Sequence, residues 1–211
     1  MKNFDFEFYM ILRYTFDMQK KRLFVAMPIP RNAALSIKRI TEELEEKFKD
    51  FSERQIRFTH HKNWHITVAF LGEQDDNALP AVADAVRIAS RKFAPPEIAF
   101  EKISYFPAHG GKAKMIWLNA DRASSERVAK IKDILENELA LRGVAFQKEM
   151  KSFSGHVTVA RLAKEIESAS LPRIERPLRF SFSAVSLDLA ESELMQSGVN
   201  YDVLQSFGFE E

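Results

Sequence analysis

The stretches His65-Ile66-Thr67-Val68-Ala69-Phe70 and His156-Val157-Thr158-Val159-Ala160-Arg161 repeat one pattern within a chain of 211 residues. In a β-strand, successive side chains point to opposite faces, so the histidine and the threonine of each copy share one face. The aliphatic residues between them point to the other face, where they can be buried. Each stretch therefore predicts a strand that carries an imidazole beside a hydroxyl, with one such strand in each half of the protein.

The two histidines of this pattern suit acid–base chemistry. Histidine has an ordinary pKa of about 6.5, so one imidazole can accept a proton near neutral pH while another donates one. If the two strands face each other across a cleft, His65 and His156 stand on either side of one small anion. The hydroxyls of Thr67 and Thr158 could then donate hydrogen bonds to the oxygens of that anion. The repeat indicates an acid–base pair that acts on a phosphate.

The composition limits the class of protein and the kind of partner. Hydrophobic residues make up 45% of the chain and charged residues 29%, as in ordinary globular proteins. The formal net charge of +1 provides no strong field for a long nucleic acid, so a small ligand or a nucleic-acid end fits better. The chain has 0 cysteines, which excludes disulfides, thiol nucleophiles and cysteine–zinc sites.

The sequence also indicates a compartment. No apolar run is long enough for a transmembrane helix. Near the N-terminus, a signal-peptide core would be interrupted by the charges of Asp5, Glu7, Arg13 and Asp17. A chain without cysteine has its simplest environment in a reducing compartment. We therefore expect a cytoplasmic protein with no membrane partner.

Hydrophobic periodicity predicts helices set between strands. The expected helices span 33–49, 75–93 and 123–142, and the expected strands span 22–27, 56–59, 64–71, 97–105, 113–119, 154–162, 178–190 and 200–207, with a loop over 163–177. Such an order predicts an α+β fold with two pseudo-symmetric lobes. Each lobe is expected to be an antiparallel sheet with helices on its outer face, and the active-site cleft should lie between the lobes.

With these motifs in place, the chain resembles the two-histidine (2H) phosphoesterase superfamily, and specifically its LigT-like branch. The hallmark of that superfamily is a pair of His-x-Thr-x motifs on strands of two lobes, here His65 to Val68 and His156 to Val159. Further similar stretches are Arg22-Leu23-Phe24-Val25-Ala26, Phe70-Leu71-Gly72, Arg161, and Ser192 followed by Gly198 and Tyr201. The resemblance covers 22–207, so we expect a single bilobal domain over 22–211.

The resemblance implies an RNA 2′,3′-cyclic phosphodiesterase that leaves a 2′-phosphate and needs neither a metal nor a cofactor. It implies His65 as general acid and His156 as general base, an order that the residues themselves leave open. Thr67 and Thr158 would bind the phosphate oxygens, and 2′-5′ RNA ligation would be the reverse reaction. The expected partners are RNA 3′ ends or small cyclic nucleotides, and the expected state is a monomer.

Phe70 and Arg161 occupy equivalent positions, five residues after each histidine. Strict strand alternation places both on the face opposite the imidazoles, so they reach the cleft only where a strand ends, twists or bulges. The resemblance implies that Arg161 binds phosphate or stacks on a base. It implies that Phe70 is a nucleobase platform, although burial in the core is an equally good interpretation.

The chain departs from the family pattern in two places. Proline commonly precedes the second motif in the LigT-like branch, whereas this chain has Gly155. Glycine leaves the backbone freer, so the imidazole of His156 is expected to be less firmly aimed. Residues 1–21 lie outside the pattern, and 1–17 form either an extension or start-site artefact, or an added edge strand.

Other polar and aromatic residues have simpler interpretations. A metal cluster of His60, His61 and His65 would require a helix where the pattern predicts a strand. Trp117 is expected to belong to the core, and Ser192 and Tyr201 to support their lobe. The loop of a predicted hairpin carries Lys102, His109, Lys112 and Lys114. It is more simply a solvated hairpin tip than a guide for an RNA 3′ end. Lys148 and Lys151 are expected to be surface charges.

Two other functions stay open. The same site could act on 2′-5′ oligonucleotides or on ADP-ribose cyclic phosphate. Alternatively, the protein could be a non-catalytic module that binds nucleotides or RNA ends. Two titratable groups on opposite sides of a phosphate favour catalysis over binding alone.

Overall fold

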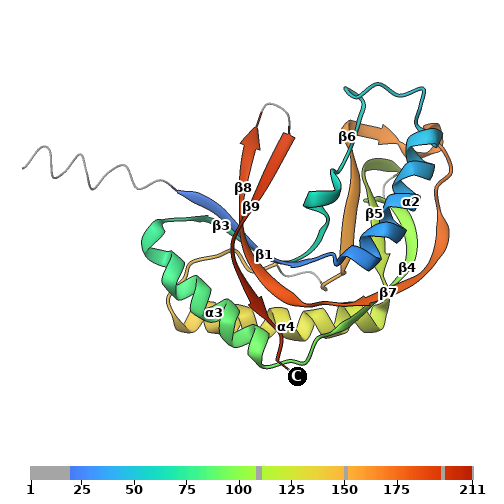
Figure 1. Ribbon diagram of the computed structural model, residues 1–211. Coiled ribbons are helices and arrows are strands. Elements are labelled where there is room, and N and C mark those ends of the chain that lie inside the picture. The colour runs from blue at the N-terminus through green and yellow to red at the C-terminus, as the bar shows by residue number, and fades with distance from the viewer. Residues whose placement is uncertain (1–19, 108–110, 150–151, 196–197, 211) are drawn as a thin grey trace, which may run out of the picture.

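The computed structural model describes residues 20–107, 111–149, 152–195 and 198–210 (Figure 1). The extension expected at 1–21 lies almost wholly outside the described residues, as do both interpretations of 1–17. Lys21 already belongs to the first strand.

Within these residues, nine strands form one antiparallel sheet. Their order is β7-β4-β5-β6-β3-β1-β8-β9, with β2 paired to β6. The strands are β1 (Lys21–Pro28), β2 (Ile56–Phe58), β3 (His65–Gln74), β4 (Glu97–Phe106), β5 (Lys112–Ala120), β6 (His156–Glu167), β7 (Arg176–Ser183), β8 (Ser186–Met195) and β9 (Gly198–Gly208).

The sheet consists of two halves that meet between β3 and β6. Among the described residues, the register pairs these two strands only at Ile66 and Val157. Beyond that point β2 pairs with β6 in place of β3. One half is therefore β7-β4-β5-β6 and the other is β3-β1-β8-β9, with one histidine motif in each (Figure 1). This arrangement confirms the α+β fold with two lobes.

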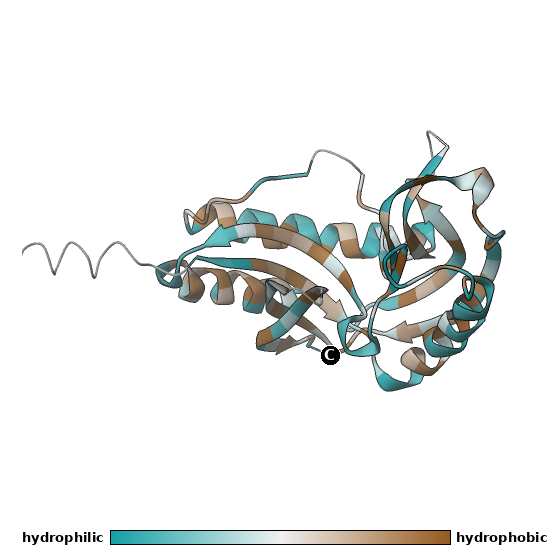
Figure 2. Ribbon diagram, turned by 90° about the horizontal axis from the view of Figure 1, so that it is seen from above, coloured by the Kyte–Doolittle hydropathy of each residue, from teal (hydrophilic) through white to brown (hydrophobic). Residues whose placement is uncertain are grey.

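Three α-helices in the described part of the chain bury their apolar side chains in a common core. They are α2 (Arg31–Lys47), α3 (Leu79–Arg91) and α4 (Arg122–Leu141), and three short 3₁₀ helices are η1 (His61–Asn63), η2 (Asp76–Ala78) and η3 (Ser168–Ser170). Helix α2 contacts β7, α3 contacts β8 and β9, and α4 contacts both β3 and β4. Helix α4 thus supports strands of both halves, and polar and apolar residues alternate along the helices (Figure 2).

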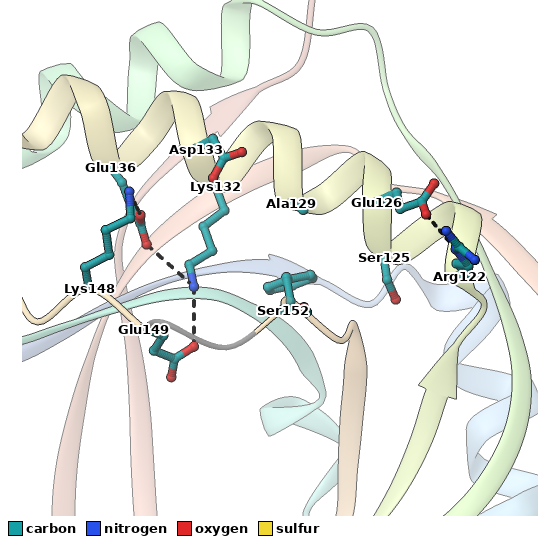
Figure 3. A pocket seen from close by; sticks show the side chains of 11 residues that line it. Arg122, Ser125, Glu126, Ala129, Lys132, Asp133, Glu136, Lys148, Glu149 and Ser152 are labelled. Atoms are coloured by element: carbon teal, nitrogen blue, oxygen red, sulfur yellow. Dashed lines mark hydrogen bonds and ion pairs between the residues drawn. The ribbon is translucent and has the colours of Figure 1, made fainter.

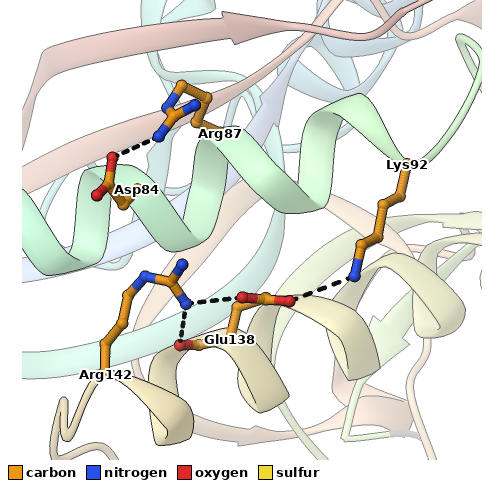
Figure 4. A network of polar contacts seen from close by, with 5 residues as sticks. All are labelled: Asp84, Arg87, Lys92, Glu138 and Arg142. Atoms are coloured by element: carbon orange, nitrogen blue, oxygen red, sulfur yellow. Dashed lines mark hydrogen bonds and ion pairs between the residues drawn. The ribbon is translucent and has the colours of Figure 1, made fainter.

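Polar side chains cap the start of α4 and tie this helix to the end of α3. The carboxylate of Asp121 caps α4 by accepting a hydrogen bond from the backbone N–H of Ser124 at 2.7 Å. Glu138 on α4 accepts hydrogen bonds from Arg142 at 2.7 Å and from Lys92, just after α3, at 3.3 Å (Figure 4).

No helix among the described residues is long and apolar enough to cross a membrane.

The prediction of a loop over 163–177 is wrong for the first part of this range. Strand β6 continues to Glu167, and Lys112 pairs with Glu167 at its far end. Strand β7 begins at Arg176. The end of β6 is largely exposed, so it lacks the apolar alternation that predicts strands; backbone pairing with β5 keeps it extended instead.

Candidate active site

The four side chains of the two motifs lie on one face of the sheet, opposite the core. Ile66 and Val157 are fully buried on the core side, where they pair with each other. In an antiparallel register, this pair places His65 across from Thr158 and His156 across from Thr67. The two imidazoles therefore lie at opposite corners of a four-residue group, related by an approximate two-fold axis through the central pair.

Each imidazole is held by a carbonyl two residues earlier in the chain. The Nδ1 atom of His65 lies 2.8 Å from the carbonyl oxygen of Asn63. The Nδ1 atom of His156 lies 2.8 Å from the carbonyl oxygen of Ser154. A carbonyl oxygen can only accept, so Nδ1 carries the hydrogen in both rings. In the neutral form this tautomer leaves each Nε2 atom as a proton acceptor.

The surroundings of His65 are aromatic. The ring of Phe24 on β1 lies 5.1 Å from the imidazole, between ring centroids. The ring of Tyr201 on β9 meets the imidazole edge-on at 5.0 Å. The hydroxyl of Thr67 lies 3.1 Å from the Nε2 atom. Tyr201 was expected only to support its lobe, and Phe24, although it lies within the quoted stretch Arg22 to Ala26, was given no role at the site.

His156 lies in a different aromatic environment. Its ring stacks on Trp117 of β5 with a centroid distance of 3.6 Å and an angle of 17°. Trp117 stacks in turn on Phe106 of β4 at 3.5 Å. The expectation that Trp117 belongs to the core is wrong. Its neighbours Ile116 and Leu118 are the fully buried residues, and alternation turns Trp117 to the opposite face.

Two matching β-bulges turn the last residue of each motif to the other face of the sheet. On β3, Ala69 pairs with β1 and so does Thr67, while Val68 between them has no partner in β1. On β6, Ala160 and Thr158 both pair with β5, while Val159 between them has no partner in β5. The extra residue shifts the alternation by one, so Phe70 and Arg161 turn to the face of the imidazoles.

Burial makes both imidazoles harder to protonate. It is the main reason why the pKa of His65 falls to about 4, and the charges of His156 and Arg161 act in the same direction. Burial also lowers the pKa of His156, again with a contribution from Arg161. The carbonyls of Asn63 and Ser154 act in the opposite direction. Both imidazoles are therefore neutral near neutral pH in the free protein.

The other polar candidates lie apart from this group. The rings of His60 and His61 lie 4.2 Å apart at the start of η1, tilted by 38° to each other. In the described part of the chain, no three histidine, aspartate or glutamate side chains gather as metal ligands would. Lys102 forms an ion pair with Glu101 at 3.4 Å. Lys148 pairs with Glu136, while His109 and Lys151 lie outside the described residues.

Several known proteins are similar to this chain in sequence. The family model described as LigT like Phosphoesterase matches residues 28–117. A Methanocaldococcus jannaschii protein named RNA 2′,3′-cyclic phosphodiesterase is 29% identical over 190 residues, covering 88% of this chain and 99% of the relative. In sequence, the chain resembles the LigT-like phosphoesterases. A Thermotoga maritima protein of the same name is 25% identical, covering 81% of this chain and 92% of its own.

Solved structures show that this chain shares its fold with known proteins. A crystal structure of a Thermus thermophilus protein has a TM-score of 0.71 at 24% identity, covering 89% of this chain and 97% of its own. Escherichia coli LigT in complex with 3′-AMP has a TM-score of 0.61 at 21% identity, covering 91% of this chain and 99% of its own. The family model reaches the first motif of the present chain and ends before the second.

Proposed function

We propose that this protein is an RNA 2′,3′-cyclic phosphodiesterase, a hydrolase that opens a 2′,3′-cyclic phosphate to a 2′-phosphate. The observation that carries the proposal is the matched pair of imidazoles, one from each half of the sheet, each held at Nδ1 by a carbonyl at 2.8 Å. The Nε2 atom of His156 is left for proton transfer, and that of His65 takes part once the Thr67 hydroxyl turns from it to the phosphate. Similar proteins of two archaea and of Thermotoga maritima bear this name.

The reaction requires a base and an acid on opposite sides of phosphorus, because the displacement is in line. His156 accepts a proton from water at Nε2, and the water oxygen bonds to phosphorus. The bond from phosphorus to the 3′ oxygen breaks, and His65 delivers a proton from Nε2 to that oxygen. The product is a 2′-phosphate with a free 3′-hydroxyl. With a 5′-hydroxyl in place of water as the nucleophile, the same steps give a 2′-5′ linkage and a free 3′-hydroxyl, and the reverse of that reaction cleaves a 2′-5′ linkage to the 2′,3′-cyclic phosphate.

Because the pKa of His65 is low, substrate binding must help to protonate this residue before it can act as the general acid. The free protein holds His65 neutral near neutral pH because its pKa is about 4. A phosphate anion between the two imidazoles favours their protonated forms, so binding raises the pKa of both. One proton taken up with the anion then supplies the general acid. Substrate binding and proton uptake are coupled in this scheme.

The remaining residues of the group stabilise charge and hold the nucleotide. The hydroxyls of Thr67 and Thr158 donate hydrogen bonds to the non-bridging oxygens, where negative charge increases in the transition state. The guanidinium of Arg161 provides a permanent charge beside both histidines. Phe70, with 60% of its surface exposed, offers a ring on which a base can stack.

The wider setting follows from the same site. We propose that the bilobal domain over 22–211 works as a monomer, because one chain supplies both halves of the site. Its ligands are RNA 3′ ends or small cyclic nucleotides. The absence of cysteine from the sequence supports a cytoplasmic location. The proposed roles need neither a metal nor a cofactor.

The test is turnover of a short RNA with a 2′,3′-cyclic phosphate end, in the presence of EDTA. Wild-type protein should give a 2′-phosphate end. General acid–base catalysis contributes about 10²–10⁴-fold, so His65→Ala and His156→Ala should each lose that much turnover. His61→Ala is the matched control, because His61 is an exposed histidine near the same strand but outside the paired group.

The outcomes separate the competing functions. Wild-type turnover in both histidine variants would exclude the acid–base roles. No turnover by the wild type would direct the assay to 2′-5′-linked oligonucleotides and ADP-ribose cyclic phosphate. Binding of RNA ends without turnover of any of these substrates would instead identify a binding module.

A further inference from the structure

The peptide group between Ser154 and Gly155 is held at both its ends. Its carbonyl oxygen accepts the hydrogen bond from the Nδ1 atom of His156 at 2.8 Å. Its N–H donates a hydrogen bond to the Oγ atom of Ser125 on α4 at 3.1 Å. These are the two ends of one planar unit. The orientation of the carbonyl that holds His156 is therefore coupled to a side chain of α4.

Gly155 is confined between α4 and β5. The residue is buried, and its own carbonyl accepts a hydrogen bond from the backbone N–H of Ala120 at 2.8 Å. A Cβ atom at this position would lie 3.2 Å from the Cβ atom of Ala120 and 3.5 Å from the Oγ atom of Ser125. The loosely aimed backbone expected from a glycine is thus not found. A proline could not donate to Ser125, because it has no N–H.

The chain just before Gly155 is also attached to α4. Lys132 forms ion pairs with Glu149 at 3.3 Å and with Glu136 at 3.5 Å, and Lys148 pairs with Glu136 at 3.2 Å. Lys132 and Glu136 are almost fully buried, with 8% and 4% of their side chains exposed. Figure 3 shows Lys132 pointing from α4 toward Glu149 and meeting it. Helix α4 therefore holds both ends of this short connection to β6.

Among the described residues, the first histidine has no such link to a helix side chain. The equivalent peptide lies between Asn63 and Trp64, and its N–H donates to the carbonyl oxygen of His61 at 3.3 Å. That contact is a backbone hydrogen bond within a local turn. In one half the turn itself satisfies the N–H, whereas in the other half the partner is Ser125. The two motifs therefore differ in what holds the peptide behind each imidazole.

We propose that Ser125 is a positioning residue for His156, acting through the peptide between Ser154 and Gly155. This proposal rests on the function proposed above. The hydrogen bond to Ser125 fixes the plane of the peptide and polarises it, which makes its carbonyl a better acceptor for the Nδ1 hydrogen. His156 is thereby kept in the tautomer that presents Nε2 to the substrate. Ser125 itself does not touch the reacting atoms.

The test compares Ser125→Ala with Ser124→Ala. Ser124 is the matched control, because it is a buried neighbour on α4 whose Oγ atom accepts from the backbone N–H of Ala99 at 2.9 Å. Both variants lose a buried hydrogen bond from a backbone N–H, and Ser124→Ala also loses the hydrogen bond of its hydroxyl to Asp121, but only the bond to Ser125 leads to His156. NMR shifts of the imidazole nitrogens should show a loss of the Nδ1–H tautomer of His156 in Ser125→Ala alone.

The kinetic effect should be equally selective. Misplacing a catalytic group slightly can lower turnover about a hundredfold, so Ser125→Ala should lower kcat roughly ten- to a hundredfold with little change in KM. Ser124→Ala should keep the wild-type kcat and the wild-type tautomer. Equal tautomer populations and equal kcat values in Ser125→Ala and the wild type would overturn the proposal.

A measurement on the wild type covers the case in which Ser125→Ala does not fold. The amide hydrogen of Gly155 should exchange slowly with solvent, since it is bonded to a buried hydroxyl. Rapid exchange of this amide would also overturn the proposal. The exchange and tautomer measurements need no substrate, so they test Ser125 even if the proposed phosphodiesterase activity is absent.

Discussion

Phe70 and Arg161 occupy equivalent places beyond two matching β-bulges, yet they present opposite chemistry to the same face of the sheet. Phe70 pairs with Phe24 on β1, and their rings lie 6.4 Å apart. Arg161 pairs with Met115 on β5, and its guanidinium donates to the Met115 sulfur at 3.0 Å. One backbone geometry therefore presents an apolar ring beside His65 and a cation beside His156.

Replacing the exposed ring should weaken substrate binding and leave the fold intact. Stacking of a base on an aromatic side chain is worth about 1–3 kcal/mol, so Phe70→Ala should raise KM by a factor of about 5 to about 160. The free energy of unfolding should change by no more than about 0.5 kcal/mol, since the side chain is largely exposed. Leu35→Ala, at another exposed apolar residue, is the control. An unchanged KM in Phe70→Ala would exclude the stacking role.

Removing the charge of Arg161 should make both imidazoles easier to protonate. The guanidinium contributes to the lowered pKa of His65 and of His156. In Arg161→Met, both pKa values should therefore rise when they are followed by NMR titration without substrate. Arg161→Lys retains the charge and should leave them close to wild type. If the two variants titrate alike, the charge does not act on the imidazoles.

Acid should destabilise the protein through His65. The neutral imidazole is favoured in the folded state, where the pKa is about 4, against an ordinary value of 6.5. Its contribution to stability is fully present above about pH 6.5 and is lost as the pH falls toward about 4, because the unfolded chain then binds the extra proton. The loss from this group is at most about 3 kcal/mol.

Urea unfolding at several pH values measures this effect. His65→Asn carries no titrating group, so its stability should depend less on pH over this interval than that of the wild type. The remaining dependence includes His156, whose pKa is also lowered. A pH dependence identical in the two proteins would contradict the burial of a neutral His65.

Trp117 should report the protonation of His156. The chain has 2 tryptophans, Trp64 and Trp117, and only Trp117 stacks on an imidazole of the site. In a Trp64→Phe background, a protonated imidazole should quench the remaining fluorescence, with a midpoint below pH 6.5 because burial lowers the pKa of His156. Adding His156→Ala should abolish the titration. If the variant with both Trp64→Phe and His156→Ala keeps the midpoint of the fluorescence titration, a group other than His156 causes the quenching.

Much of the fold was predictable because its signals are local. Strand alternation at His65 and at His156 predicted both motif strands, and β3 and β6 begin at these two residues. Helical spacing predicted 123–142, where α4 spans Arg122–Leu141. Each signal arises among neighbouring residues, so no knowledge of distant contacts was needed. The end of β6 was missed because its pairing depends on another strand.

Several features of the site have no local signal. The bulges at Val68 and Val159 exist only in the register of β3 with β1 and of β6 with β5. Strict alternation therefore placed Phe70 and Arg161 on the wrong face. Trp117 was assigned to the core for a similar reason, since an apolar strand does not indicate which of its faces meets a histidine.

The sequence alone was enough to identify the two histidine–threonine pairs, their place on strands and the chemistry they suit, because those properties belong to short stretches of chain. The tertiary structure was needed to bring Tyr201 to His65, Trp117 to His156 and Ser125 to the peptide behind His156. These contacts join segments far apart in the chain. They depend on strand register, on bulges and on the packing of α4, which no local pattern of residues specifies.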